Sequence, residues 1–114
     1  GNISMEDYLE TLKSDFNQHH IDFFQSNVEG ELINRMQQDD FDALVINPGA
    51  YTHYSYAIAD AIKAVTTKVV EVHISDIYAR EGFRATSVTG VNCLKIISGK
   101  GLPGYVEAVE EFLK

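Results

Sequence analysis

Apolar residues recur at helical spacing in four segments of the chain, and each segment can bury one face against a core. The predicted helices span residues 4–16, 29–38, 54–65 and 103–114. Ser4 is placed to cap the first helix, with the acidic Asp7 in its first turn. Pro103 stands where the first turn of a helix tolerates proline.

Shorter apolar runs between these helices predict β-strands. We expect the strands at residues 21–26, 43–48, 68–74 and 92–98. The aromatic residues Phe23, Phe24 and Phe41 are expected in the core. Strands and helices alternate, which predicts an α/β fold with a parallel sheet and helices on both faces. In such folds ligands bind beyond the carboxyl ends of the strands.

Length, composition and charge favour a single domain that covers residues 1–114. The chain has 114 residues, of which 45% are hydrophobic, and no repeat or linker divides it. Its formal net charge of −8 disfavours nucleic acid and an anionic membrane surface as partners, because both would repel the protein. An anionic substrate would therefore need a local cluster of positive groups.

The single cysteine, Cys93, stands in an apolar run, so neither an intrachain disulfide nor a cysteine metal site is expected. A buried, unreactive thiol is the simplest interpretation. No apolar run approaches the roughly 20 residues of a membrane span, and the first residues lack the charged and apolar regions of a signal peptide. These observations favour a cytoplasmic protein.

Polar side chains gather near the end of the strand at 68–74. Glu71 and His73 are two residues apart, so both project to one face of the sheet. A carboxylate beside an imidazole orients the ring and favours its protonated form, which a general acid near neutral pH requires. The alternative is a histidine that is merely hydrogen-bonded within the sheet.

The residues after this strand could bind an anion. Ser75 or Asp76 can cap a short helix, and the free backbone N–H groups at its start would suit a carboxylate or phosphate, although capping alone also explains these residues. Arg80 and Arg84 are four residues apart and are expected on one helical face. They could bind an anionic or polyhydroxylated ligand, or pair with surface acids.

The preceding strand brings further polar groups to the same rim. Asn47, Gly49 and His53 follow its carboxyl end, so two neighbouring strand ends place amide, imidazole, hydroxyl and guanidinium groups together. This convergence favours a functional site. The glycines at 98–104 lack the spacing of a phosphate-binding loop, so we expect only a turn there.

Three segments together resemble the type II 3-dehydroquinate dehydratases. They are FFQSNVEGELI, INPGAYTHYSYAIADAI and VEVHISDIYAREGFR, and the resemblance covers essentially all 114 residues. It implies a flavodoxin-like three-layer sandwich with a parallel sheet of order 2-1-3-4-5, assembled as a dodecamer of four trimers. It also implies a lyase that reversibly converts 3-dehydroquinate to 3-dehydroshikimate through an enolate, without metal or cofactor. The role of this reaction in the shikimate pathway of aromatic amino acid biosynthesis, or in quinate catabolism, stays open.

The resemblance assigns roles to residues of this chain. His73 matches the general acid that protonates the departing C1 hydroxyl, and Glu71 matches the carboxylate that accompanies it. The implied substrate-binding residues are Asn47, Gly49, His53, Asp60, Ile74, Ser75 and Arg84. Among these, Ile74 and Ser75 would hold the substrate carboxylate, and Asp60 would reach in from a neighbouring subunit.

The chain also departs from the family pattern. Asp76 replaces the usual asparagine, and its negative charge would weaken anion binding unless the side chain turns away to cap the helix. In the family, a first strand and a mobile lid with the catalytic tyrosine precede the residues that match Gly1 and Asn2. We therefore expect these 114 residues to lack the lid and a central strand between 21–26 and 43–48.

Two other functions stay open at this stage. A non-catalytic flavodoxin-like binding or phosphoacceptor domain would share the fold, although a phosphoacceptor needs clustered acids and this rim is dominated by His, Asn and Arg. Flavin binding would favour that alternative. A truncated assembly piece without activity would explain the absence of the tyrosine.

Overall fold

The computed structural model describes residues 4–114, so the positions matched to Gly1 and Asn2 lie outside the described part. The α-helices are α1 (Met5–Asp15), α2 (Glu29–Gln37), α3 (Tyr56–Ala64) and α4 (Pro103–Phe112). The strands are β1 (Leu44–Ile46), β2 (Val69–His73) and β3 (Lys95–Ser98). Short 3-10 helices are η1 (Gly49–His53), η2 (Ile77–Ala79), η3 (Gly82–Ala85) and η4 (Thr89–Asn92).

Local signals in the sequence explain where several helices begin. Ser4 caps α1, because its side chain accepts a hydrogen bond of 3.1 Å from the backbone N–H of Asp7. Ser55 caps α3 in the same way, and Pro103 opens α4 as predicted. No helix in the described range is long and apolar enough to cross a lipid bilayer.

The three strands form a parallel sheet in the order β1-β2-β3, which confirms the predicted parallel α/β arrangement. The central strand β2 pairs Glu71 with Ile46 on one side and with Ile96 on the other. All five residues of β2 are buried, as expected for a strand with neighbours on both edges and both faces.

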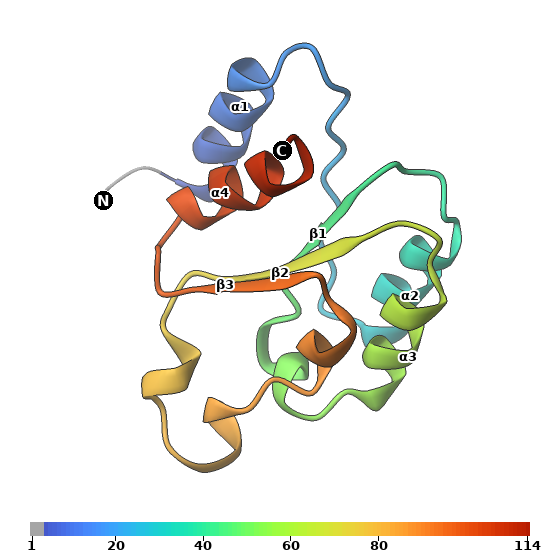
Figure 1. The fold of residues 1–114 in the computed structure, drawn as a ribbon, viewed down its shortest axis with the longest axis vertical. Helices are drawn as coiled ribbons and strands as arrows, with labels where there is room; N and C mark the ends of the chain where they lie inside the picture. The colour runs from blue at the N-terminus through green and yellow to red at the C-terminus, as the bar shows by residue number, and fades with distance from the viewer. Residues whose placement is uncertain (1–3) are drawn as a thin grey trace.

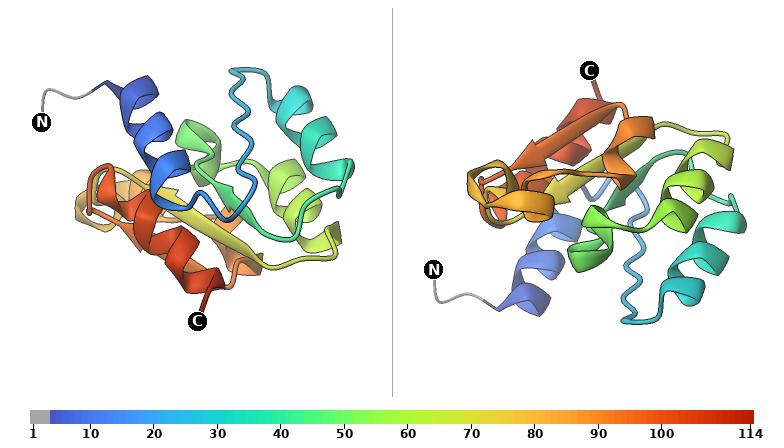
Figure 2. Two further views of the ribbon diagram at one scale, coloured as in Figure 1. Left: turned by 90° about the horizontal axis from the view of Figure 1, so that it is seen from above. Right: turned by 90° about the horizontal axis from the view of Figure 1, so that it is seen from below.

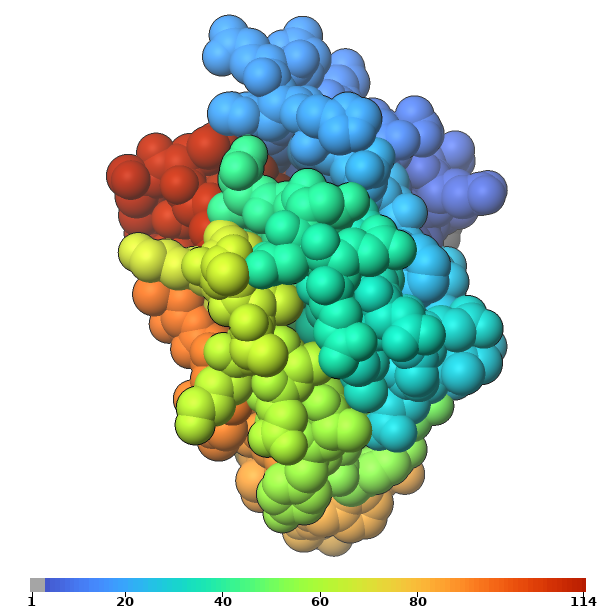
Figure 3. Space-filling model, turned by 90° about the vertical axis from the view of Figure 1, so that its right-hand side faces the viewer, coloured from blue at the N-terminus to red at the C-terminus, as the bar shows by residue number. Residues whose placement is uncertain are grey.

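Helices cover both faces of the sheet (Figure 1; Figure 2). On one face, α2 and α3 pack side by side, and Figure 3 shows them forming the outer surface of that layer. Their core cluster consists of Met36, Ile46, Ile58, Ala61, Ile62 and Val69. On the opposite face, α4 packs on the sheet through Ala108 against Val70, Val72 and Ile97. Val69 and Val70 thus face opposite sides, so Glu71 and His73 share the face of Val69.

The predicted strand at 21–26 is wrong, because these residues form an irregular segment that pairs with none of the three described strands. A strand requires a hydrogen-bonding neighbour, and an apolar pattern does not replace one. The predicted burial of two aromatic residues is wrong for the same reason: Phe23 is 39% exposed and Phe24 is 50% exposed. Phe41 is partly buried. The five-strand order stays a prediction.

Candidate active site

A hollow of about 360 Å³ lies at the carboxyl ends of β1 and β2, where the sequence predicted a site. Its lining residues are Asn47, Gly49, Ala50, His53, His73, Ile74, Ser75, Ile77, Arg80 and Arg84. The structure therefore brings together most of the predicted site residues. Glu71 lies behind His73 rather than in the wall, and Asp60 is elsewhere.

The charge of this hollow differs from that of the chain. Arg80 and Arg84 line it together with two histidines, and its described lining contains no carboxylate. The chain as a whole carries a formal net charge of −8. The hollow is thus the kind of local positive cluster that an anionic ligand requires.

The His73 imidazole and the Glu71 carboxylate are buried and in hydrogen-bond contact at the end of β2. The His73 Nε2 atom lies 2.8 Å from Glu71 Oε2, and the two residues are 5% and 0% exposed. Burial alone would raise the pKa of Glu71, but hydrogen bonds from His73, Ser87 and Thr89 outweigh it and lower the pKa below its usual value. An ionised carboxylate only accepts hydrogen bonds, so His73 Nε2 carries a hydrogen and Nδ1 is left for the hollow.

His53 is oriented by the backbone on the other side of the hollow. Its Nδ1 atom lies 2.9 Å from the carbonyl oxygen of Thr86, and a carbonyl cannot donate, so Nδ1 carries the hydrogen. In the tautomer with a single hydrogen on Nδ1, Nε2 is an acceptor. The ring also packs edge-on against Phe83, with centroids 5.9 Å apart. His53 is thereby set to accept a hydrogen bond from a ligand hydroxyl.

Asn47 follows β1 and is held by two internal hydrogen bonds. Its Oδ1 atom accepts from the backbone N–H of Gly49 at 3.1 Å, and its Nδ2 atom donates to the hydroxyl of Tyr105 at 3.0 Å. Gly49 has a φ of 60°, a left-handed conformation that favours glycine. A side-chain amide has two N–H donors, so one remains for a ligand.

The Asp76 side chain caps a helix and does not line the hollow, which is the arrangement expected to leave anion binding unimpaired. Its Oδ1 atom accepts a hydrogen bond of 3.0 Å from the backbone N–H of Tyr78 and so caps η2. Ser75 does not cap the helix, because its hydroxyl accepts from Arg80 Nη2 instead. The negative charge of Asp76 therefore lies at the N-terminus of η2, where it accepts a backbone hydrogen bond.

The prediction that Arg80 and Arg84 share one helical face is wrong. Arg80 follows η2 in an extended conformation, and Arg84 belongs to the separate helix η3. Gly82, with a φ of 61°, interrupts any continuous helix between them. Both side chains nevertheless line the hollow, because the turn between the two helices folds them toward it.

Asp60 is exposed on α3 and does not line the hollow. Its predicted role in the site of a neighbouring subunit is compatible with this exposure and stays a prediction. The residues that sequence reasoning missed are Ser87 and Thr89, which donate to Glu71. The available signal was indirect: a carboxylate inside a buried strand needs donors from other segments.

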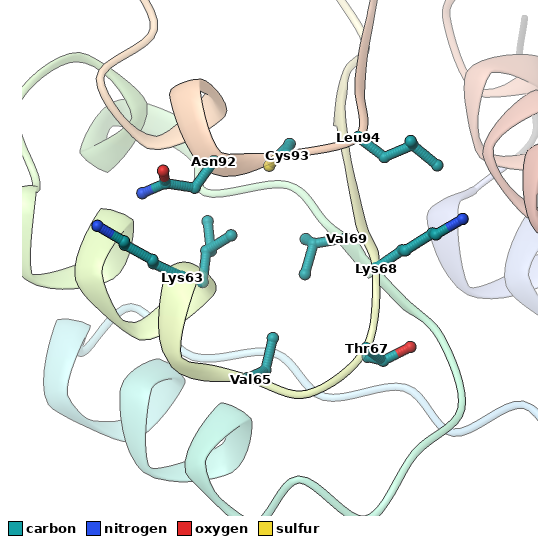
Figure 4. Close-up of a pocket in the computed structure, with 9 residues that line it drawn as sticks. Lys63, Val65, Thr67, Lys68, Val69, Asn92, Cys93 and Leu94 are labelled. Carbon is teal, nitrogen blue, oxygen red and sulfur yellow. The ribbon is translucent and has the colours of Figure 1, made fainter.

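A second hollow of about 320 Å³ lies at the other end of β2 (Figure 4). Lys63 and Lys68 border it, but their side chains extend away from each other. Burial, with the nearby charge of Glu71, raises the pKa of Cys93 to about 12, so this thiol stays protonated at neutral pH. The prediction of an unreactive cysteine agrees with this environment, and the second hollow has no comparable set of converging polar groups.

The structure is an α/β protein with a parallel sheet, a buried imidazole–carboxylate pair and a basic hollow at the carboxyl ends of its strands. Comparison with known proteins then gives the family. Residues 1–113 match the family model described as dehydroquinase class II, and the chain belongs to this family. The resemblance noted in the sequence is thereby confirmed.

Individual relatives agree with this assignment. The chain is 50% identical over 116 residues to the 3-dehydroquinate dehydratase of Thermotoga petrophila, covering 100% of this chain and 81% of the relative. It is 47% identical to the 3-dehydroquinate dehydratase of Clostridium beijerinckii over 96% of this chain and 79% of the relative. The crystal structure of type II dehydroquinase from Butyrivibrio crossotus superposes with a TM-score of 0.94 at 41% identity, covering 100% of this chain and 83% of that one.

Proposed function

We propose that the protein catalyses the reversible dehydration of 3-dehydroquinate to 3-dehydroshikimate. The observation that carries this proposal is the buried pair of His73 and Glu71, which presents an imidazole nitrogen to a basic hollow. Relatives at 47% to 50% identity bear the name 3-dehydroquinate dehydratase. 3-Dehydroquinate is a small carboxylate with several hydroxyls, which suits a hollow lined by arginines, histidines and polar groups.

In this proposal His73 is the general acid. Loss of a proton next to the substrate carbonyl gives an enolate, and the C1 hydroxyl must then leave as water. The imidazolium form of His73 would donate its Nδ1 hydrogen to that oxygen as the C–O bond breaks, while Glu71 stabilises the positive ring. Proton abstraction, which the family resemblance gives to a tyrosine, is not assigned to any of the residues that line the hollow.

The remaining residues would bind and orient the substrate. Ser75 accepts a hydrogen bond from Arg80, which leaves the hydrogen of its own hydroxyl for the substrate carboxylate beside Ile74. His53 Nε2 and the Arg84 guanidinium would hold the ring hydroxyls, one as acceptor and the other as donor. These contacts fix the C1 hydroxyl against His73.

The first expected result is direct activity. The protein expressed from its complete reading frame should convert 3-dehydroquinate into the ultraviolet-absorbing enone of 3-dehydroshikimate. Because the proposed acid is an imidazole and none of the described residues that line the hollow is a lysine, chelators should not reduce the rate, and borohydride with substrate should not inactivate the protein. Inactivation by borohydride would indicate a Schiff base and would contradict the proposed mechanism. Flavin binding without dehydration would favour a binding domain.

Replacing Arg84 with alanine should mainly weaken substrate binding. Arg84 lines the hollow but does not contact the His73 and Glu71 pair, so KM should rise about 10-fold or more while kcat changes less. Steady-state kinetics measure both constants. Lys63→Ala is the matched control, because it removes one positive charge beside the second hollow and should leave KM unchanged. An equal rise in KM for both variants would show that only net charge matters.

We also propose that Asp60 contributes to the site of a neighbouring subunit in an assembly of trimers. Its exposure on α3, away from the hollow of its own subunit, supports this role. Light scattering on the complete protein should show a trimer or a multiple of it, and Asp60→Ala should reduce activity without lowering the thermal unfolding temperature. A fully active monomer would contradict the proposal.

A further inference from the structure

We propose that Ser87 and Thr89 are positioning residues for the general acid. Their hydroxyls hold the carboxylate of Glu71 in the one orientation in which it meets the His73 imidazole. This inference rests on the proposed dehydration and adds two residues that do not line the hollow.

The hydrogen bonds around Glu71 occupy both oxygens of its carboxylate. Oε2 accepts from His73 Nε2 at 2.8 Å and from Ser87 Oγ at 2.6 Å, and Oε1 accepts from Thr89 Oγ1. Ser87 Oγ itself accepts from the backbone N–H of Gly90 at 2.8 Å, which directs the hydroxyl hydrogen toward Glu71. Rotation of the carboxylate would break at least one of these bonds, so its plane is held in place.

Gly90 allows this close approach. A Cβ atom at this position would lie 2.9 Å from Glu71 Oε2, 2.8 Å from Ser87 Oγ and 2.3 Å from Ile96 Cδ1. A side chain would therefore displace the Ser87 hydroxyl, the Glu71 carboxylate or the end of the Ile96 side chain. The absence of a side chain lets the backbone at the start of η4 pack directly against the carboxylate.

The same stretch of chain, residues 86–90, also fixes the second imidazole of the site. The carbonyl oxygen of Thr86 accepts from His53 Nδ1, and the backbone N–H of Val88 donates to the carbonyl oxygen of Thr52 at 2.8 Å. Segment 86–90 thus connects to η1 through its backbone and to β2 through its hydroxyls. One continuous stretch sets the orientation of both histidines in the hollow.

The electrostatics of the pair depend on these hydroxyls. Glu71 is fully buried, and a buried carboxylate stays ionised only when donors replace the lost water. The other titratable groups whose pKa values respond to Glu71 are Tyr78 from η2 and Cys93 after η4, and burial raises both of those pKa values. Near neutral pH the Tyr78 and Cys93 side chains therefore stay uncharged, and neither adds a negative charge beside Glu71.

The test compares Thr89→Val, which removes the hydroxyl at nearly constant volume, with Thr89→Ser, which keeps it. In the complete protein, Thr89→Val should lower kcat about 10-fold and change KM less than about twofold, because a hydrogen bond to a charged group is lost behind the acid and not in the hollow. Thr89→Ser should restore most of the rate. Thr67→Val is the matched control, because it removes a hydroxyl that donates to the backbone carbonyl of Asp42 near the opposite end of β2, away from the hollow.

A second measurement does not depend on activity. Carbon-13 NMR can follow the titration of the glutamate carboxyls, and the Glu71 signal is the one that disappears in Glu71→Gln. Its titration midpoint should be higher in Thr89→Val than in the wild type. Unchanged kcat in Thr89→Val, or an unchanged midpoint, would overturn the inference. Failure of the wild type to dehydrate 3-dehydroquinate would instead overturn the proposed function, and the NMR titration would still decide whether the hydroxyls hold the carboxylate ionised.

Discussion

Replacing His73 with alanine should lower kcat by about 10²- to 10⁴-fold, the usual consequence of losing a general acid. The effect should be this large because no other described residue pairs a carboxylate with an imidazole in the hollow. Without the imidazolium, the C1 hydroxyl would have to leave without a proton donor at contact distance. KM should change much less, because substrate contacts are assigned to other residues.

The control is His19→Ala, an exposed histidine in the turn after α1. It should retain the wild-type rate, and thermal unfolding should show both variants folded. Near-normal turnover in His73→Ala would contradict the assignment of the acid. A loss of folding in His73→Ala would be visible in the same unfolding experiment and would call for His73→Gln, which keeps more of the buried volume.

Replacing Glu71 with glutamine should have the second-largest effect, lowering kcat by about 10²-fold. The substitution preserves the shape of the side chain but removes the negative charge that stabilises the imidazolium form of His73. Both carboxylate oxygens of Glu71 accept hydrogen bonds, and glutamine replaces one of them with an NH₂ group that cannot accept. At least one of the buried donors to Glu71 therefore loses its acceptor. The free energy of unfolding should fall by roughly 1–3 kcal/mol.

The pH dependence of stability provides an independent check of the same residue. The folded-state pKa of Glu71 is lowered, because hydrogen bonds from His73, Ser87 and Thr89 outweigh the effect of burial. A carboxyl of this kind stabilises the fold fully above its unfolded value of about 4.3, and this contribution is lost as the pH falls through the lower folded value. Denaturant unfolding between neutral pH and the acid range should therefore show a steeper acid loss in the wild type than in Glu71→Gln.

Glu107→Gln is the matched control for this comparison. Glu107 pairs with Lys100 at 3.8 Å on the partly exposed side of α4, and neither residue lines the hollow or contacts Glu71. Exposed pairs contribute little, so this variant should keep the rate and the acid sensitivity of the wild type. If Glu71→Gln behaved in the same way as Glu107→Gln, the charge of Glu71 would have no special role.

Features of the fold that arise from local periodicity are predictable from the amino-acid sequence. Helical spacing of apolar residues predicts each of the four α-helices in the described residues, and Ser4 marks the start of the first one. The two-residue period of a strand predicts that Glu71 and His73 share one face, and in the structure His73 Nε2 lies 2.8 Å from Glu71 Oε2. Alternation of strands and helices then placed the site at the carboxyl ends of β1 and β2, because a parallel sheet aligns those ends.

Features that depend on contacts between residues distant in sequence are set by the packing of the folded chain. Residues 21–26 have the apolar content of a strand, but a strand exists only where another backbone pairs with it, and none of the three described strands does so. Arg80 and Arg84 reach the same hollow through a turn at Gly82 and not along a helix. The hydroxyl donors to Glu71 were not predictable either, because hydrogen bonds to a buried carboxylate are made by whichever segment packs over it, and only the folded chain brings residues 86–90 there.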